Sequence, residues 1–142
     1  MYNMAAKDYE MSKAICEAVA EFDPGLIILG LSGSETIRAA KDCGLKTALE
    51  VFADRAYEED GSLVDRRKPG AVIRDEQEAI ERVIRMVKEG KVTAVTGKDI
   101  PIRADSVCVH GDGEKALLFV EKIKKALSEE GIEIRPLREI CG

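Results

Sequence analysis

The chain has 142 residues, of which 45% are hydrophobic and 35% are charged, with a formal net charge of -5 at pH 7. This length predicts a single domain over residues 1–142, and the composition is typical of a soluble, helix-rich protein. The negative charge argues against nucleic-acid and anionic-membrane partners. No apolar run is long enough to cross a membrane and the first residues do not form a signal peptide, so we expect a cytoplasmic protein.

The first predicted elements are a helix and a strand. Residues 8–22 carry apolar side chains at spacings of three and four, which predicts an amphipathic helix that ends at Asp23-Pro24-Gly25. Residues 26–31 are apolar throughout, which predicts a strand buried on both faces.

A second helix and strand are expected next. Ser32 and Glu35 stand at the spacing of a capping box, so a helix should open there and run to about Cys43, with Gly44 as its C-cap. Residues 46–52 form the following predicted strand.

The polar segment 53–70 is long for a connection in an α/β protein, and such loops are often functional. It contains the turn signals Asp60-Gly61 and Pro69-Gly70. Arg66, Arg67 and Lys68 form a basic stretch that is compatible with anion binding, although a solvated loop is the simpler interpretation.

The rest of the chain continues the alternation of helices and strands. We expect helices at residues 75–89 and 113–130, and strands at residues 92–95, 107–110 and 132–134. Asp75 and Glu78 form a second capping pair, and Gly90 ends that helix. The pattern predicts an α/β fold with parallel strands, but it supplies too few strands to close a β/α barrel.

The single histidine, His110, is the first candidate catalytic residue. It ends an apolar run and precedes Gly111 and Asp112, so it should lie at the carboxyl end of a strand, where parallel α/β proteins bind substrates. Imidazole is an acid or a base near neutral pH, and Asp112 is the expected carboxylate partner. A structural, hydrogen-bonded histidine is the alternative interpretation.

A second candidate cluster contains Glu50, Asp54 and Arg55, where the strand 46–52 meets the long loop. Two carboxylates at this place could polarise water, bind a divalent cation or orient a base, and Arg55 suits a carboxylate or phosphate. Glu50 lies between apolar residues, so its burial would need a partner, which we expect to be Arg55 or His110. A solvated charge cluster is the alternative.

Ser32, Gly33 and Ser34 join a predicted strand to a helix N-terminus, where free N–H groups make a potential phosphate site. The segment is neither a Walker sequence nor a G-x-G-x-x-G motif, so plain capping of the helix is the stronger interpretation.

The four cysteines have the spacing of neither a disulfide framework nor a zinc site, and we expect small buried side chains and no metal ligands. Apolar neighbours should raise the pKa of the Cys108 thiol, which argues against a nucleophilic role for it.

Taken in order, five segments resemble the LamB/YcsF family, which supplies the A component of the bacterial three-component 5-oxoprolinase. They are GLSGSE (30–35), EVFADRAY (50–57), DGSLV (60–64), PGAVI (69–73) and VCVHGDG (107–113). Tyr2 and Asn3 match the end of a further K-P-H-G-A-L-Y-N motif. Chains of this family are roughly twice as long as this one. The resemblance therefore implies that this chain forms the C-terminal half of an irregular, TIM-like, seven-stranded β/α barrel.

The resemblance implies ATP-dependent opening of the lactam of 5-oxoproline to L-glutamate, together with B and C subunits. In this scheme His110 and Asp112 act on the reacting centre, and Glu50 and Asp54 position water or a divalent cation. Arg55 holds the substrate carboxylate or a phosphate, with Ser32, Gly33 and Ser34 as further phosphate ligands.

Two other functions remain open from the sequence. The chain could be an inactive remnant that only binds the B and C subunits, or a hydrolase similar to polysaccharide deacetylases, which predicts a bound divalent ion. Half a barrel would expose two sheet edges, so we expect either a homo-oligomer formed through them or a chain that needs its missing N-terminal half.

Overall fold

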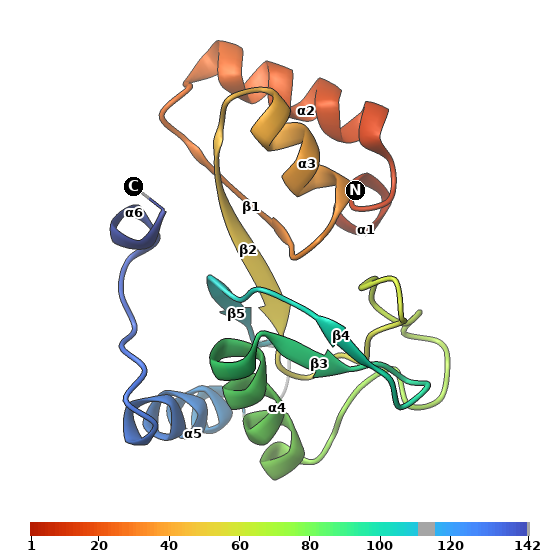
Figure 1. Cartoon of the computed structure of the whole chain (residues 1–142), viewed down its shortest axis with the longest axis vertical. Helices are drawn as coiled ribbons and strands as arrows, with labels where there is room; N and C mark the ends of the chain where they lie inside the picture. Colours follow the sequence, from red (N-terminus) through yellow and green to blue (C-terminus); the bar gives the residue numbers. More distant parts are fainter. Residues whose placement is uncertain (111–115, 142) are drawn as a thin grey trace.

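The computed structural model describes residues 1–110 and 116–141 and arranges them around one long strand, β2 (Lys46–Phe52). Figure 1 shows α2 (Tyr9–Phe22) and α3 (Glu35–Asp42) at one end of β2, and α4 (Glu76–Glu89) and α5 (Ala116–Glu129) at the other. Two short helices complete the described elements, α1 (Tyr2–Ala5) and α6 (Leu137–Ile140).

The main sheet has three parallel strands in the order β1-β2-β5, with β1 at Ile27–Leu31 and β5 at Ser106–Cys108. In the register of the sheet, Leu31 pairs with Glu50, and Phe52 pairs with Cys108. The carboxyl ends of all three strands therefore meet at one edge. This confirms an α/β fold in which parallel strands alternate with helices, whereas the seven-stranded barrel and association through the sheet edges remain predictions.

A second, two-stranded sheet is antiparallel and differs from the expected alternation. It pairs β3 (Lys91–Thr93) with β4 (Asp99–Pro101), a strand that was not predicted from the sequence. The connection turns at Gly97, which has a φ of 86°, and the Ala94 N–H donates to the Lys98 carbonyl at 2.8 Å. A link this short can join antiparallel strands only, because a parallel crossover needs a dozen or more residues.

Helix ends confirm the capping predicted for α4 and contradict the capping predicted for α3. Asp75 accepts from the Glu78 N–H at 2.8 Å, and Gly90 ends α4 at a φ of 63°. Asp8, for which no capping role was predicted, accepts from the Met11 N–H at 3.0 Å. The capping box at Ser32 is wrong. Helix α3 begins at Glu35 with Ser34 as its N-cap residue, and Ser32 Oγ instead accepts from the Arg103 N–H at 3.1 Å.

Three strand predictions need correction. Strand β1 is not buried on both faces, since Leu29 is 41% exposed; β1 is an edge strand whose one covered face packs on α3. Strand β5 ends at Cys108, so His110 lies just beyond it. Residues 132–134 form no strand, because the Ile132 N–H donates to the Leu127 carbonyl at 2.9 Å and so closes the end of α5.

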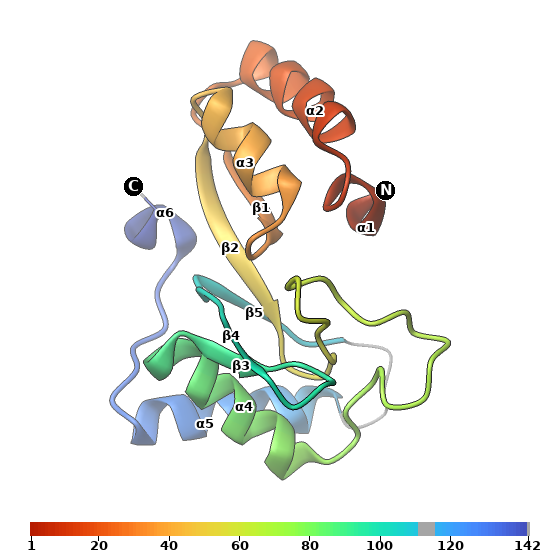
Figure 2. The same ribbon diagram turned by 45° about the vertical axis from the view of Figure 1, so that its right-hand side comes forward.

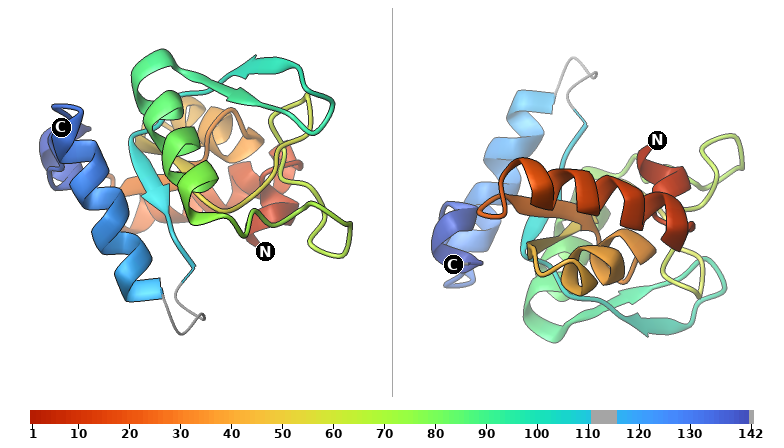
Figure 3. Two further views of the ribbon diagram at one scale, coloured as in Figure 1. Left: turned by 90° about the horizontal axis from the view of Figure 1, so that it is seen from below. Right: turned by 90° about the horizontal axis from the view of Figure 1, so that it is seen from above.

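The main hydrophobic core lies between the sheet, the β3-β4 hairpin and helices α4 and α5, which pack together in Figure 2. Its most deeply buried large side chains are Tyr57, Met86, Val51, Val83 and Val92. A smaller cluster around Cys16 lies between α2 and α3, seen side by side in the right-hand view of Figure 3. Among the helices of the described residues, none has the length and apolarity that a membrane crossing requires.

Candidate active site

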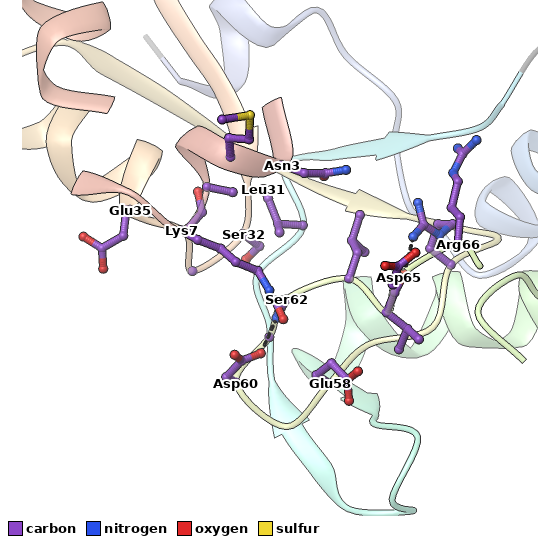
Figure 4. A pocket seen from close by; sticks show the side chains of 18 of the residues that line it. Asn3, Lys7, Leu31, Ser32, Glu35, Glu58, Asp60, Ser62, Asp65 and Arg66 are labelled. Atoms are coloured by element: carbon purple, nitrogen blue, oxygen red, sulfur yellow. Dashed lines mark hydrogen bonds between the residues drawn. The ribbon is translucent and has the colours of Figure 1, made fainter. Parts of the chain in front are cut away.

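A cavity of about 260 Å³ lies at the edge of the sheet where the three strands end. It adjoins a wider cavity of about 850 Å³ between the long loop and the segment that carries Ser32 and Glu35 (Figure 4). The residues that line the smaller cavity come from α1, β2, the long loop and the segment after β5; they are Tyr2, Asn3, Glu50, Phe52, Arg55, Leu63, Arg66 and His110.

His110, which lines this cavity, forms a pair with Asp54. Nδ1 of His110 lies 2.9 and 2.8 Å from the two carboxylate oxygens of Asp54, and both side chains are mostly buried. The expected partner of His110, Asp112, lies outside the described residues. Asp54 was predicted at the same edge as His110, and the structure shows that it supplies the carboxylate that contacts the ring.

The hydrogen bonds of His110 assign its tautomer. Arg66 Nη2 contacts Nε2 of the ring on the side opposite Asp54. An arginine can only donate, so Nε2 must be the acceptor and Nδ1 must carry the proton that it donates to Asp54. The imidazole is therefore neutral, with the basic lone pair at Nε2. An aspartate behind Nδ1 and a lone pair at Nε2 are the arrangement of a general base.

Two aromatic rings fix the orientation of the imidazole. Phe52 stacks on His110 with ring centroids 5.8 Å apart and an interplanar angle of 30°. Tyr2 in turn meets Phe52 edge-on at 6.0 Å and 73°. Stacking restricts rotation of His110, which keeps Nδ1 on Asp54 and Nε2 toward the cavity.

Glu50 pairs with neither of its predicted partners. The hydroxyl of Tyr2 donates to Glu50 Oε2 at 2.5 Å, whereas Arg55 and His110 bond elsewhere. Burial, together with this bond to Glu50, raises the pKa of Tyr2, so the tyrosine stays a neutral donor. Burial also raises the pKa of the Cys108 thiol to about 11, as its apolar surroundings predict.

Arg55 organises the long loop from inside. The side chain is only 4% exposed, and it donates from Nη2 to the Val64 carbonyl at 2.5 Å and from Nε to the Ala71 carbonyl at 3.4 Å. Burial lowers the pKa of the guanidinium, and the nearby charge of Arg66 lowers it further. These contacts account for Arg55 without a ligand, so its binding of a substrate carboxylate stays a prediction.

Ser32, Gly33 and Ser34 line the wider cavity, but several backbone N–H groups of this segment are already hydrogen-bonded. The N–H groups of Ser32, Ser34 and Glu35 donate to the carbonyls of Glu50, Leu31 and Ala6. The side chains around the same cavity are mixed in charge: Figure 4 shows the acidic Glu35, Asp60 and Asp65 together with the basic Lys7 and Arg66. Binding of ATP, the nucleotide that the resemblance implies, therefore stays a prediction.

A divalent cation finds no ready site in residues 1–110 and 116–141. No group of three or more His, Cys, Asp or Glu side chains in that part of the chain is arranged to hold a metal ion. Asp54 and Glu50, which were predicted to position such a cation or a water molecule, instead contact His110 and Tyr2. Positioning of water by these carboxylates remains a prediction.

Three residues of the site were not predicted from the sequence to act there. Arg66 was interpreted as part of a solvated loop, and Phe52 was counted only as a strand residue. Tyr2 and Phe52 had a signal, because Tyr2 matches the end of a family motif and Phe52 lies in the EVFADRAY segment. Arg66 lies outside the segments that carry the resemblance, and its contact with His110 joins positions that are far apart in the chain.

Comparisons with known proteins agree with the resemblance. The model of the LamB/YcsF family matches residues 1–142. The A component of 5-oxoprolinase from Clostridium beijerinckii is 65% identical over 140 residues, 99% of this chain and 55% of that protein. The protein of the same name from Campylobacter jejuni subsp. doylei is 59% identical over 134 residues, 94% of this chain and 52% of its own length.

The fold has a solved counterpart as well. A lactam utilization protein from Thermus thermophilus superposes with a TM-score of 0.85 at 40% identity, covering 94% of this chain and 53% of that protein. The chain thus spans about half the length of the relatives that it matches.

Proposed function

The chain belongs to the LamB/YcsF family, and from this premise we propose that it acts in a 5-oxoprolinase as part of the A component. The proposed reaction is the ATP-dependent hydrolysis of the lactam of 5-oxoproline to L-glutamate, carried out with B and C subunits. The observation that carries the proposal is the pair of His110 and Asp54, in which His110 borders a cavity at the carboxyl edge of a parallel sheet.

His110 acts as the base that activates water. Nε2 takes a proton from a water molecule, and the water oxygen forms a bond to the lactam carbonyl carbon. Asp54 stabilises the imidazolium that results, because it already accepts the Nδ1 proton. When the carbon–nitrogen bond of the ring breaks, the electron pair of that bond stays on nitrogen, which takes the proton from Nε2 and becomes the amine of glutamate.

An unstrained amide is a poor electrophile, and ATP would supply activation of the carbonyl oxygen when bound. Glu50, held by the Tyr2 hydroxyl, borders the same cavity as His110 and is placed to orient the attacking water. These two roles, base and positioning carboxylate, are the ones that we assign to the described residues.

The test is to assay glutamate formation from 5-oxoproline and ATP by the chain mixed with purified B and C subunits. A chimera, in which this chain replaces the matching stretch of the Clostridium beijerinckii protein, supplies the full length of a relative. We expect the chimera to be active and His110→Gln in it to lose activity. Binding to the B and C subunits without turnover by the chimera would favour an inactive binding module, and neither binding nor turnover would contradict any role in this enzyme.

A further inference from the structure

Arg66 occupies the one nitrogen that His110 needs for catalysis. Its Nη2 contacts Nε2 of the ring, so the lone pair that would accept a proton from water is already engaged. In this arrangement the base is blocked, and Arg66 must leave before His110 can act. Binding of the substrate must therefore displace Arg66 from Nε2.

Arg66 is placed to leave without disturbing the fold. Its side chain is exposed, and within residues 1–110 and 116–141 it forms no ion pair with a carboxylate. Its neighbours in the loop do: Arg67 pairs with Asp65 at 2.5 Å, and Lys68 pairs with Glu58 at 3.2 Å. The guanidinium of Arg66, which faces the cavity, is thus bonded to a neutral imidazole. A neutral ring nitrogen is a weaker acceptor for an arginine than a carboxylate is.

We propose that Arg66 is a latch on His110 that the carboxylate of the substrate opens. A carboxylate offers a charged, bidentate acceptor that matches the guanidinium fork, so it displaces the single bond to a neutral ring nitrogen. Arg66 and His110 line the same cavity of about 260 Å³, several times the volume of a water molecule at about 30 Å³. A small lactam acid bound there would draw Arg66 onto its carboxylate and free Nε2 beside its carbonyl group.

This inference rests on the proposed function for the identity of the acid and makes Arg66 the residue that selects it. A lactam that lacks the carboxylate would leave the latch closed. 2-Pyrrolidone has the same ring as 5-oxoproline without the acid. The enzyme would then discriminate against 2-pyrrolidone in two ways, through weaker binding and because Arg66 stays bonded to Nε2 of His110.

The chain has a single histidine, so signals from histidine labelled with ¹⁵N report on His110 alone. In the wild-type chain we expect the neutral tautomer with the proton on Nδ1 and an Nε2 signal shifted by a donor. Arg66→Met, which has no donor, should lose this shift, whereas Arg67→Met, at the residue that pairs with Asp65, should keep it. Adding 5-oxoproline should move the wild-type signal toward that of Arg66→Met, and adding 2-pyrrolidone should not.

Acylation of the free ring nitrogen by diethyl pyrocarbonate gives a second readout. We expect Arg66→Met to raise the rate of His110 modification roughly tenfold, the order that one hydrogen bond from a charged donor represents. Equal Nε2 signals in the wild type and Arg66→Met, or equal responses to the two lactams, would overturn the latch even in an active enzyme. A latch that opens for 5-oxoproline in a chain that never supports glutamate formation would keep the latch and contradict the proposed function.

Discussion

Nδ1 of His110 lies within 2.9 Å of both carboxylate oxygens of Asp54, although 56 positions separate the two residues in the chain. The pairing follows from the sheet: Phe52 and Cys108 are register partners, and Asp54 and His110 each lie two positions beyond one of them. Parallel pairing of β2 and β5 thus builds the pair from two strand ends.

Asp54→Asn tests this pair through the tautomer of the imidazole. An amide at this position donates to Nδ1 as readily as it accepts, so it no longer forces the proton onto that nitrogen. We expect the turnover of the chimera to fall by about 10² to 10⁴, the range that general-base catalysis supplies. Steady-state glutamate formation measures the loss.

Asp42→Asn is the matched control for this substitution, because Asp42 accepts a hydrogen bond from Tyr9 on the outer surface of α3. It should leave turnover unchanged. Turnover of Asp54→Asn close to that of the control would remove Asp54 from the mechanism.

Two substitutions of Glu50 separate the effect of its charge on turnover from the effect of its hydrogen bond on stability. In Glu50→Gln the amide oxygen still accepts from the Tyr2 hydroxyl, so we expect the melting temperature to stay near that of the wild type. Loss of the negative charge should nevertheless lower turnover, by about tenfold or more if Glu50 orients the attacking water. Glu50→Ala removes both and should lower stability and turnover together. Full activity in Glu50→Gln would show that the charge has no catalytic part.

Arg55→Lys distinguishes a loop-organising residue from a substrate ligand. A lysine has no planar fork to span the Val64 and Ala71 carbonyls, so one buried acceptor should lose its donor. We expect unfolding by urea to show a loss of about 1 to 3 kcal/mol, with no such loss for the exposed Arg67→Lys. Unchanged stability combined with a raised KM for 5-oxoproline would instead assign Arg55 to the substrate carboxylate, as predicted from the sequence.

Tyr57 makes the fold sensitive to alkali. Its ring is fully buried, its hydroxyl accepts from the Phe52 N–H at 2.9 Å, and burial raises its pKa from 10.0 to about 12. Tyr57 ionises first in the unfolded chain, so its contribution to stability is constant below pH 10, falls as the pH rises from about 10 to 12, and then levels off. The loss should total about 3 kcal/mol. Urea unfolding across this range should show the loss in the wild type and a flatter curve in Tyr57→Phe.

The parts of the fold that the sequence predicted are those set by local rules. Helices α2 and α4 carry an aspartate cap and a regular apolar face, and both begin where Asp8 and Asp75 indicate. Strand β2 matches its predicted bounds, since residues 46–52 lie between a glycine stop and a polar loop. These signals lie within a few positions of the element that they define.

What the sequence did not predict depends on contacts between distant segments. Ser32 resembles a helix cap, yet it bonds to the Arg103 N–H across the molecule. Residues 132–134 have the composition of a strand, but the end of α5 uses the Ile132 amide. Glu50 had plausible partners nearby, and the residue that contacts it is Tyr2 in a helix 48 positions away.

The most direct test of the proposed mechanism is the rate of glutamate formation from 5-oxoproline by the chimera with B and C subunits, compared between His110 and His110→Gln. Glutamine keeps a polar side chain of similar size but cannot take a proton from water. The mechanism predicts a fall of at least about 10² in turnover with unchanged binding of the B and C subunits. Turnover within a fewfold of the wild type would contradict the assignment of His110 as the base.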